Sequence, residues 1–271
     1  MDEESEIIPE SLSRWLLEAG KLALALSGGV DSGVLLAAAV RVLGRANCLA
    51  LTAAPPYVRR GEITAAATLA RRLGVRHEIA ALETPETVAG NPPLRCYHCK
   101  KTLFSHLGET ARRAGFSRLA DGTNADDQND YRPGMRALEE LGVASPWLAC
   151  GVGKQTIRRV GRALGLPSSL VEAMPSPCLL TRLEHGMAID EEQLRRVEQA
   201  EDWLVREVGG NVRLRCLSNG SARIELEPER VCLLEESSRR ERCRAALQKL
   251  GFDMWRVDPA GYRSGSMNVL P

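Results

Sequence analysis

The chain of 271 residues has few aromatic side chains and no excess of charge of either sign. It contains 4 Trp, 4 Tyr and 3 Phe, and its 36 Lys and Arg residues nearly balance 35 Asp and Glu residues. Proteins that grip single strands of nucleic acid use aromatic stacking platforms, and proteins that bind nucleic acid without sequence preference use clustered cations. The composition therefore argues against nucleic acid as a partner.

Long apolar runs are also missing. No stretch approaches the roughly 18 uninterrupted apolar residues typical of a membrane span, so we expect no membrane partner. The first ten residues, MDEESEIIPE, are acidic and lack the basic and apolar regions of a signal peptide. We therefore expect a cytoplasmic protein, whose cysteines stay reduced unless they bind metal or do chemistry.

Short apolar runs alternate with helical patterns through the first half of the chain. The strands are predicted at residues 21–26, 48–53, 76–82 and 117–121. This alternation predicts an α/β fold with a parallel sheet. After a proline-rich connector, a charged helix and a hairpin of alternating strands predict a smaller α+β domain. We place the two domains at residues 1–170 and 171–271.

The motif SGGVDS, residues 27–32, follows the first predicted strand and precedes a helix. Its glycines permit a tight turn, and the N–H groups that open the helix attract an anion. The chain lacks the lysine of the Walker pattern GxxxxGK(S/T), and it also lacks GxGxxG. The motif therefore predicts a phosphate loop of another type, and the alternative is a plain strand-to-helix turn capped by Asp31 and Ser32.

A second polar loop, GTNADD at residues 122–127, follows the fourth predicted strand. Ligands of open α/β sheets bind at the carboxyl ends of strands, and Mg²⁺ prefers carboxylate oxygens. We therefore expect this loop to share a magnesium nucleotide site with the phosphate loop. The alternative is a polar turn without a ligand.

Three of the eight cysteines lie in polar loops. Cys96 and Cys99 form a CxxC among cations in RCYHCKK, and Cys178 lies in the proline-constrained PSPCLLTR. Thiolates are favoured in such surroundings. A redox dithiol, a zinc site completed by His98 or His185, an iron–sulfur cluster and inert surface thiols all remain open. The other cysteines occupy apolar or helical segments and are expected to be buried: Cys48, Cys150, Cys216, Cys232 and Cys243.

Six motifs together resemble the LarE-type enzymes, ATP-dependent sulfur transferases of the PP-loop pyrophosphatase superfamily. In chain order they are SGGVDS, RCYHCKK, GTNADD with DYRPG, SPCLLTR, VRLR with SARIE, and GYRSGSMN. The resemblance implies that ATP is cleaved to AMP and pyrophosphate to adenylate a carboxylate of pyridinium-3,5-biscarboxylic acid mononucleotide. Sulfur then replaces the activated oxygen, and the product serves the synthesis of a nickel-pincer cofactor.

The resemblance also assigns nucleotide-binding roles to particular residues. Residues 27–32 would hold pyrophosphate with Asp31 near Mg²⁺, and Thr52 would lie beside the adenosine. The full set implied for ATP and Mg²⁺ is Ser27, Gly28, Gly29, Asp31, Ser32, Thr52, Gly122, Asn124, Asp126 and Asp127. Asp31 would also be catalytic.

For sulfur delivery the resemblance offers two routes. Some members sacrifice the sulfur of the cysteine that matches Cys178. Others resemble cluster enzymes, in which three cysteines leave one iron of a [4Fe–4S] cluster open to hydrosulfide from sulfide or another donor. Because the chain has Cys96 and Cys99 as well as Cys178, the resemblance places it with the second kind.

Substrate contacts are implied in the smaller domain. Arg213 and Arg215 alternate along one strand and would bind the substrate phosphate, while Arg182 and Glu201 match by position. A solvated face paired across the hairpin is the alternative for the two strand arginines, and a helical polar face is the alternative for Glu201. The resemblance further implies a homo-oligomer such as a hexamer. Competing functions are a tRNA thiolase and a nucleotide-binding redox sensor.

Overall fold

The computed structural model describes residues 7–129, 133–174 and 176–263. Parts of the DYRPG and GYRSGSMN motifs, and Pro175 of the predicted cysteine loop, lie outside the described residues. The chain forms two compact units, Met1–Pro85 with Cys96–Ser176, and Glu86–Arg95 with Pro177–Pro271. The sequence boundary after residue 170 had left residues 86–95 in the first domain, whereas the structure groups them with the second unit.

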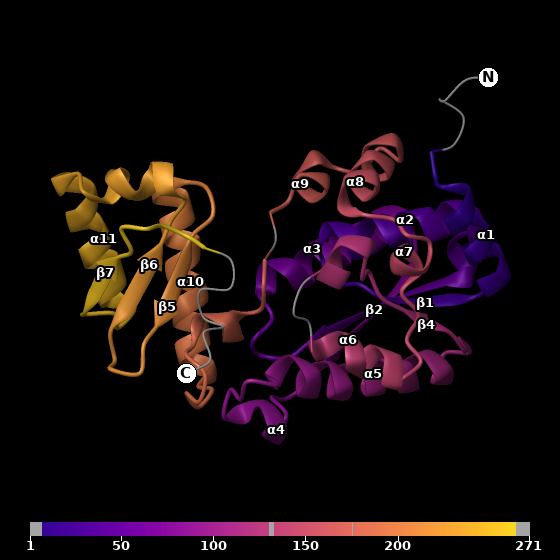
Figure 1. The fold of residues 1–271 in the computed structure, drawn as a ribbon, viewed down its shortest axis with the longest axis horizontal. Helices are drawn as coiled ribbons and strands as arrows, with labels where there is room; N and C mark the ends of the chain where they lie inside the picture. The colour runs from indigo at the N-terminus through magenta and orange to yellow at the C-terminus, as the bar shows by residue number, and fades with distance from the viewer. Residues whose placement is uncertain (1–6, 130–132, 175, 264–271) are drawn as a thin grey trace. The chain divides into compact units, whose positions relative to one another are not determined.

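The first unit is built on a four-stranded parallel sheet in the order β3-β2-β1-β4 (Figure 1). Its strands are β1 Leu22–Ala25, β2 Cys48–Ala54, β3 Arg76–Ala81 and β4 Leu119–Ala120. Its helices are α1 Glu10–Ala19, α2 Val30–Leu43, α3 Arg60–Leu73, α5 Arg95–Arg113, α6 Pro133–Glu140, α7 Pro146–Ala149, α8 Lys154–Ala163 and α9 Ser168–Val171, with short 3-10 turns at Arg45–Asn47 and Ala125–Asn129. The predicted α/β fold with a parallel sheet is confirmed.

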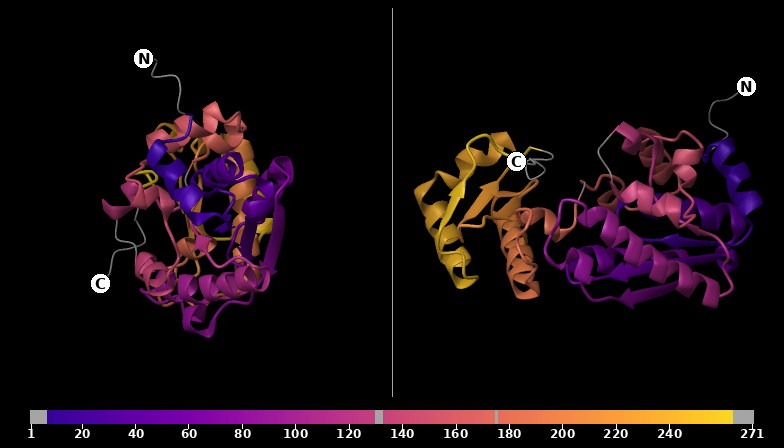
Figure 2. Two further views of the ribbon diagram at one scale, coloured as in Figure 1. Left: turned by 90° about the vertical axis from the view of Figure 1, so that its right-hand side faces the viewer. Right: turned by 60° about the horizontal axis from the view of Figure 1, so that its bottom comes forward.

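Helices cover both faces of this sheet because successive side chains of a strand point to opposite sides. Leu22 and Leu24 of β1 pack into a core with α1, α2 and α8, whereas Ala23 packs with Leu107 and Ala111 of α5. Figure 2 shows the sheet and its helices from two further directions. At the carboxyl ends of β1, β2 and β4, loops lead into the next helix or 3-10 turn.

The second unit contains a three-stranded sheet and two longer helices. Its strands are β5 Arg213–Cys216, β6 Ala222–Glu225 and β7 Trp255–Val257, and its helices are α4 Glu86–Ala89, α10 Glu191–Val208 and α11 Ser237–Lys249, with 3-10 turns at Leu179–Arg182 and Pro228–Leu234. β5 and β6 form the predicted hairpin, and β7 pairs parallel to β6.

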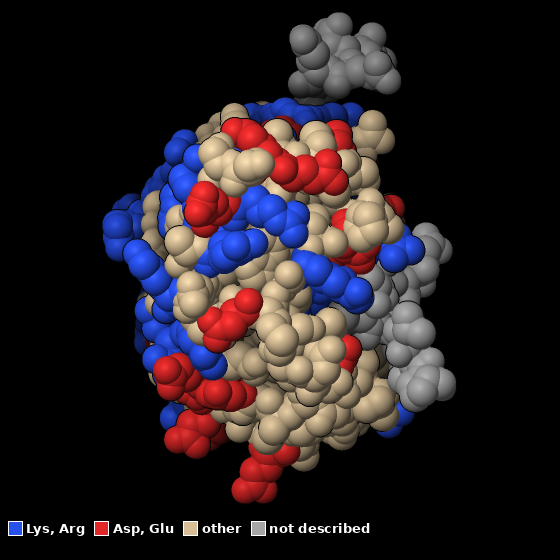
Figure 3. Space-filling model, turned by 90° about the vertical axis from the view of Figure 1, so that its left-hand side faces the viewer, with Lys and Arg blue, Asp and Glu red and all other residues tan. Residues whose placement is uncertain are grey.

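The near-balance of acidic and basic residues in the sequence is also seen on the surface (Figure 3). On the face shown in Figure 3, acidic and basic side chains are interspersed. No helix among the described residues is both long and apolar enough to cross a bilayer.

Candidate active site

The phosphate loop joins the end of β1 to the start of α2. Ser27 N–H donates to Ser32 Oγ at 3.2 Å, and the two hydroxyl oxygens are 3.0 Å apart. Gly29 precedes the first residue of α2, and no side chain caps that helix from this position. The opening N–H groups of α2 therefore point into the loop, where an anion can satisfy them.

Gly28 is required by both backbone conformation and space. Its φ is +85°, and a Cβ there would lie 2.3 Å from the carbonyl oxygen of Glu62. A Cβ at Gly29 would meet nothing closer than Ser27 Oγ at 3.5 Å, an ordinary contact. A side chain can therefore be accommodated at Gly29 but not at Gly28.

Gly28→Ala should lower the free energy of unfolding by about 2 kcal/mol or more, because the positive φ and the Glu62 carbonyl both oppose a side chain. Gly29→Ala should change it by less than about 1 kcal/mol. Urea denaturation of both variants measures the difference. Equal effects would mean that the loop does not hold this conformation.

The second polar loop touches the phosphate loop through Gly122. A Cβ on Gly122 would lie 2.7 Å from Ser32 N, so only glycine allows this approach. The neighbouring Asn124 is fully buried, its Oδ1 accepts from Asp126 N–H, and its Nδ2 has no hydrogen-bond partner among the described residues.

The two aspartates of this loop take different directions. Asp127 is buried, and its Oδ2 accepts from Asn124 N–H at 3.1 Å. Asp126 is exposed, and its Oδ2 accepts from the backbone N–H of Lys154 at 2.7 Å, which caps the start of α8. The Lys154 ammonium in turn lies 3.5 Å from Asp31 Oδ2. The start of α8 is thereby tied to both polar loops.

A cavity of about 300 Å³ opens where these loops meet the ends of β1 and β2 and the side of α5. The predicted residues that line it are Ser27, Gly29, Asp31, Ser32, Thr52, Gly122 and Asp127. Apolar side chains of Leu51, Val58 and Phe104 form part of its wall. The mixture of a polar loop end and an apolar wall suits a nucleotide.

Thr52, which lines this cavity, connects β2 to the residue after β1 and to β3. Its hydroxyl donates to Leu26 O at 2.7 Å, and His77 Nε2 lies 2.8 Å from Thr52 Oγ1. Because a threonine hydroxyl has one proton, His77 must donate through Nε2–H. Burial lowers the pKa of His77, which favours this neutral form.

The CxxC occupies the first turn of α5, on the helix that walls the cavity. Cys96 is exposed and Cys99 is half-buried, with the hydroxyl of the buried Tyr57 3.1 Å from its Sγ. Directly after them, Lys100, Leu103 and Phe104 line the cavity. The two cysteines therefore precede the cavity-lining residues on the same helix, but they do not line the cavity themselves.

A cluster around Glu140 of α6 fastens this turn. The Tyr97 hydroxyl and the Lys101 ammonium donate to Glu140 Oε2 at 2.8 and 2.7 Å, and Arg136 donates to Oε1 at 2.8 Å. Hydrogen bonds from Lys101, Arg136 and Tyr97 lower the pKa of Glu140 to about 2. A Cβ at Gly134 would lie 3.3 Å from Cys96 O, so α6 packs directly on the cysteine turn.

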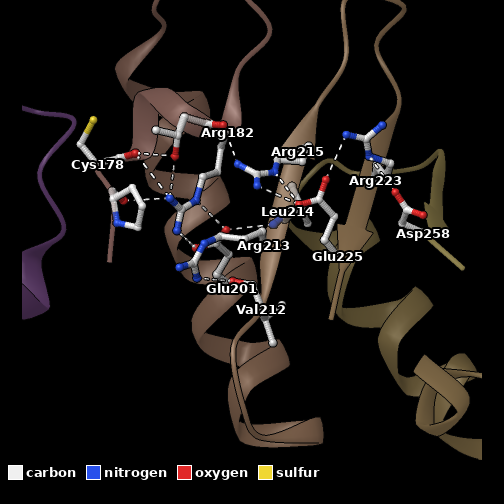
Figure 4. Close-up of polar contacts among 12 residues, drawn as sticks. Cys178, Arg182, Glu201, Val212, Arg213, Leu214, Arg215, Arg223, Glu225 and Asp258 are labelled. Carbon is white, nitrogen blue, oxygen red and sulfur yellow. Dashed lines mark hydrogen bonds and ion pairs between the residues drawn. The ribbon is translucent and has the colours of Figure 1, made fainter. Parts of the chain in front are cut away.

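In the second unit, the loop that carries Cys178 is held by a buried ion pair (Figure 4). Arg182 and Glu201 form two hydrogen bonds of 2.9 Å, and their side chains are 0% and 1% exposed. Arg182 Nη1 also donates to Pro177 O at 2.8 Å and to Thr181 Oγ1 at 2.8 Å. Both residues, assigned to substrate by resemblance, thus contact one another and the cysteine loop.

The hairpin arginines are buried rather than solvated. Arg215 donates twice to Glu225 Oε2, at 2.9 and 2.8 Å, and once to Thr181 O. Arg213 stacks over the Tyr262 ring and donates to Val212 O. Burial, and then the positive charge of Arg182, lower the pKa of Arg213 to about 10. This unit therefore concentrates guanidinium groups on one side of its sheet.

The sequence matches a model of the NAD synthase family over residues 9–107. It is 36% identical to slr1717, an uncharacterized protein of Synechocystis, over 96% of both chains. It is 32% identical to the pyridinium-3,5-bisthiocarboxylic acid mononucleotide synthase of Lactiplantibacillus plantarum, over 93% of this chain and 91% of that one. The chain belongs to the LarE family. It is an enzyme that uses ATP, a sulfurtransferase.

In this LarE-family chain the predicted residues separate by unit. The nucleotide residues belong to the first unit together with Cys96 and Cys99, whereas Cys178, Arg182, Glu201, Arg213 and Arg215 belong to the second. No three His, Cys, Asp or Glu side chains within the described ranges are grouped as metal ligands.

Among the other cysteines of this LarE-family chain, burial was wrongly predicted from the sequence for one. None of the eight cysteines, all of which lie in the described ranges, forms a disulfide. Cys48, Cys216 and Cys243 are buried as expected, and burial raises their pKa values to about 11, 12 and 12. Cys150 is half-buried, and Cys232 is exposed, so the prediction of burial was wrong for Cys232.

Four residues at the nucleotide site were not singled out from the sequence. Glu62, Lys100 and Asp121 line the cavity, and Lys154 reaches Asp31. Asp121 ends a predicted strand, and Lys154 is the first residue of α8. Ligands of open α/β sheets bind at the carboxyl ends of strands. Glu62 and Lys100 lie inside helices, where the pattern gave no such signal.

Proposed function

We propose that this enzyme adenylates the carboxylates of pyridinium-3,5-biscarboxylic acid mononucleotide and converts them to thiocarboxylates, releasing AMP and pyrophosphate. The observation that carries the proposal is the place of the cysteine pair. Cys96 and Cys99 open the helix whose next two turns wall the nucleotide cavity. The printed name of the Lactiplantibacillus relative supplies the substrate class.

The phosphate loop would bind the pyrophosphate part of ATP. The uncapped N–H groups of α2 and the paired hydroxyls of Ser27 and Ser32 would face a phosphate there. Asp31 and Asp127 offer carboxylate oxygens that fit Mg²⁺, which would neutralise charge on the phosphates. Leu51 and Val58 would pack against the adenosine.

The cysteines would deliver the sulfur. Cys96 and Cys99 are three residues apart on the first turn of α5, and the Tyr57 hydroxyl contacts Cys99 Sγ. This donor set fits two ligands of a [4Fe–4S] cluster, and we assign the third to Cys178. Bound there, the cluster would supply an open iron for hydrosulfide. Sacrifice of the Cys178 sulfur is the competing route.

The substrate phosphate would bind among the arginines of the second unit. Arg182, Arg213, Arg215 and Arg223 share this region with the carboxylates of Glu201, Glu225 and Asp258. Burial lowers the pKa of Arg213 to about 10, and a bound phosphate would offset the loss of solvation of its charge. We therefore retain Arg213 and Arg215 as substrate residues, with Arg182 and Glu201 shaping the loop beside them. A homo-oligomer stays a prediction.

Incubation with ATP, Mg²⁺, sulfide and the biscarboxylate mononucleotide should yield AMP and pyrophosphate in equal amounts together with thiocarboxylate, as measured by chromatography and mass spectrometry. Release of ADP and phosphate would overturn the proposal.

Asp31→Asn should reduce the rate of pyrophosphate release roughly a hundredfold, equivalent to about 3 kcal/mol, because Mg²⁺ would lose a carboxylate ligand and would neutralise the phosphates less well. Asp253→Asn, at an exposed position of the second unit, should leave the rate unchanged and serves as the control. The rate is measured with a coupled pyrophosphate assay. An Asp31→Asn enzyme as fast as the parent would remove Asp31 from the magnesium site.

A further inference from the structure

The lining of the nucleotide cavity contains more carboxylates than cations. Its lining includes the carboxylates of Asp31, Glu62, Asp121 and Asp127, and among the described residues that line it Lys100 is the one cation. The phosphate loop itself contains no lysine. Since like charges repel strongly in a partly buried site, the cation in the cavity wall should contribute directly to nucleotide binding. Lys154 lies outside this lining and pairs with Asp31.

The pairing of Lys100 leaves its hydrogen-bond donors available. Its Nζ lies 3.8 Å from Asp121 Oδ2, which is beyond hydrogen-bond distance. Asp121 already accepts from Thr123 N–H at 3.2 Å, from Thr123 Oγ1 and from Ser145 Oγ at 2.7 Å. Asp121 therefore orients the ammonium group by charge alone, and an ammonium has three protons to donate.

The stem of Lys100 is fixed by its neighbours. A Cβ at Gly134 would lie 2.8 Å from Lys100 Cδ, so α6 packs against the stem. The ammonium lies 5.7 Å from the centroid of the Phe104 ring, one turn further along α5. A held stem loses less side-chain entropy when the head group binds an anion.

The position of Lys100 in the chain indicates which phosphate it meets. It directly follows Cys99, and the α-phosphoryl group is the one that stays with the acceptor until sulfur arrives. In the proposed function, the phosphate loop would bind the two phosphates that leave. We propose that Lys100 binds the α-phosphoryl group of ATP and of the adenylate, an inference that rests on the proposed function.

Lys100→Met tests this, with Lys101→Met as the matched control. Lys101 is the next residue and pairs with Glu140 at 2.7 Å, and it does not line the cavity. Affinities for AMP and for inorganic pyrophosphate are measured separately, by displacement of a fluorescent ATP analogue from the full chain. This assay needs neither substrate nor sulfur.

Lys100→Met should weaken AMP binding roughly ten- to a hundredfold, because a charge-assisted hydrogen bond is lost. Pyrophosphate binding should change by less than about threefold, and Lys100→Arg should restore part of the AMP affinity. Unchanged AMP binding, a loss confined to pyrophosphate, or an equal loss in Lys101→Met would overturn the inference. Absence of nucleotide binding by the parent chain would instead overturn the proposed function along with it.

Discussion

Cys178→Ala should abolish thiocarboxylate formation while the first release of pyrophosphate continues, because adenylation needs the phosphate loop and not the thiol. If the three cysteines hold one cluster, Cys96→Ala and Cys99→Ala should have the same effect. All three variants should then lose iron and acid-labile sulfide and the brown absorption. Quenched-flow product analysis and metal counting after anaerobic purification measure both outcomes.

The control for this series is Cys232→Ala. Cys232 is exposed, whereas Cys48 and Cys243 are buried and their replacement would also remove core packing. Cys232→Ala should keep full iron content and activity. If Cys96→Ala still completes one turnover, and the parent chain loses the mass of hydrogen sulfide, then Cys178 is sacrificed and the cluster assignment fails.

Arg182→Ala should destabilise the chain by about 3–5 kcal/mol, since it would leave the Glu201 carboxylate buried without its bidentate partner. The control is Arg162→Ala. Arg162 pairs with Glu172 at 2.8 Å, but both side chains are at least half exposed, at 59% and 50%, so its loss should cost less than about 1 kcal/mol. Chemical denaturation measures both values, and equal losses would contradict the reasoning.

A double variant separates stability from positioning. Arg182→Met combined with Glu201→Leu removes both charges of this ion pair, so it should recover part of the lost stability, although the buried Arg213 remains beside it. It should still fail in sulfur transfer, because the donor that holds Pro177 O and Thr181 Oγ1 is gone. A double variant with parental sulfur transfer would show that Arg182 does not order the cysteine loop.

The parallel sheet and the phosphate loop could be predicted because their signals are local. Apolar runs of four to seven residues become β1 and β2, and SGGVDS lies between a strand and a helix as expected. The hairpin was also found, since its strands alternate around an Asn-Gly turn. The short strand β7 was missed because three residues carry too little pattern.

Interactions between distant residues could not be predicted in this way. GTNADD contains two aspartates, and nothing in the motif tells which one reaches the cavity. Which aspartate lines the cavity depends on Lys154, which lies 28 residues after Asp126. The Lys154 N–H donates to Asp126, whereas Asp127 lines the cavity. Likewise, Arg215 was expected on a face exposed to solvent or substrate. The 3-10 turn Leu179–Arg182 contacts β5 and buries it, which no hairpin pattern announces.

The grouping of residues 86–95 with the second unit limits how the protein can be shortened. Asn91 is fully buried there, its Nδ2 donates to Glu184 O at 2.8 Å, and the adjoining backbone bonds to Gly186 and Ile189. A fragment that starts at Pro177 would lack this peptide and expose the surface that it covers. The smaller unit should therefore be produced alone only when residues 86–95 are supplied as a separate peptide or fused by circular permutation.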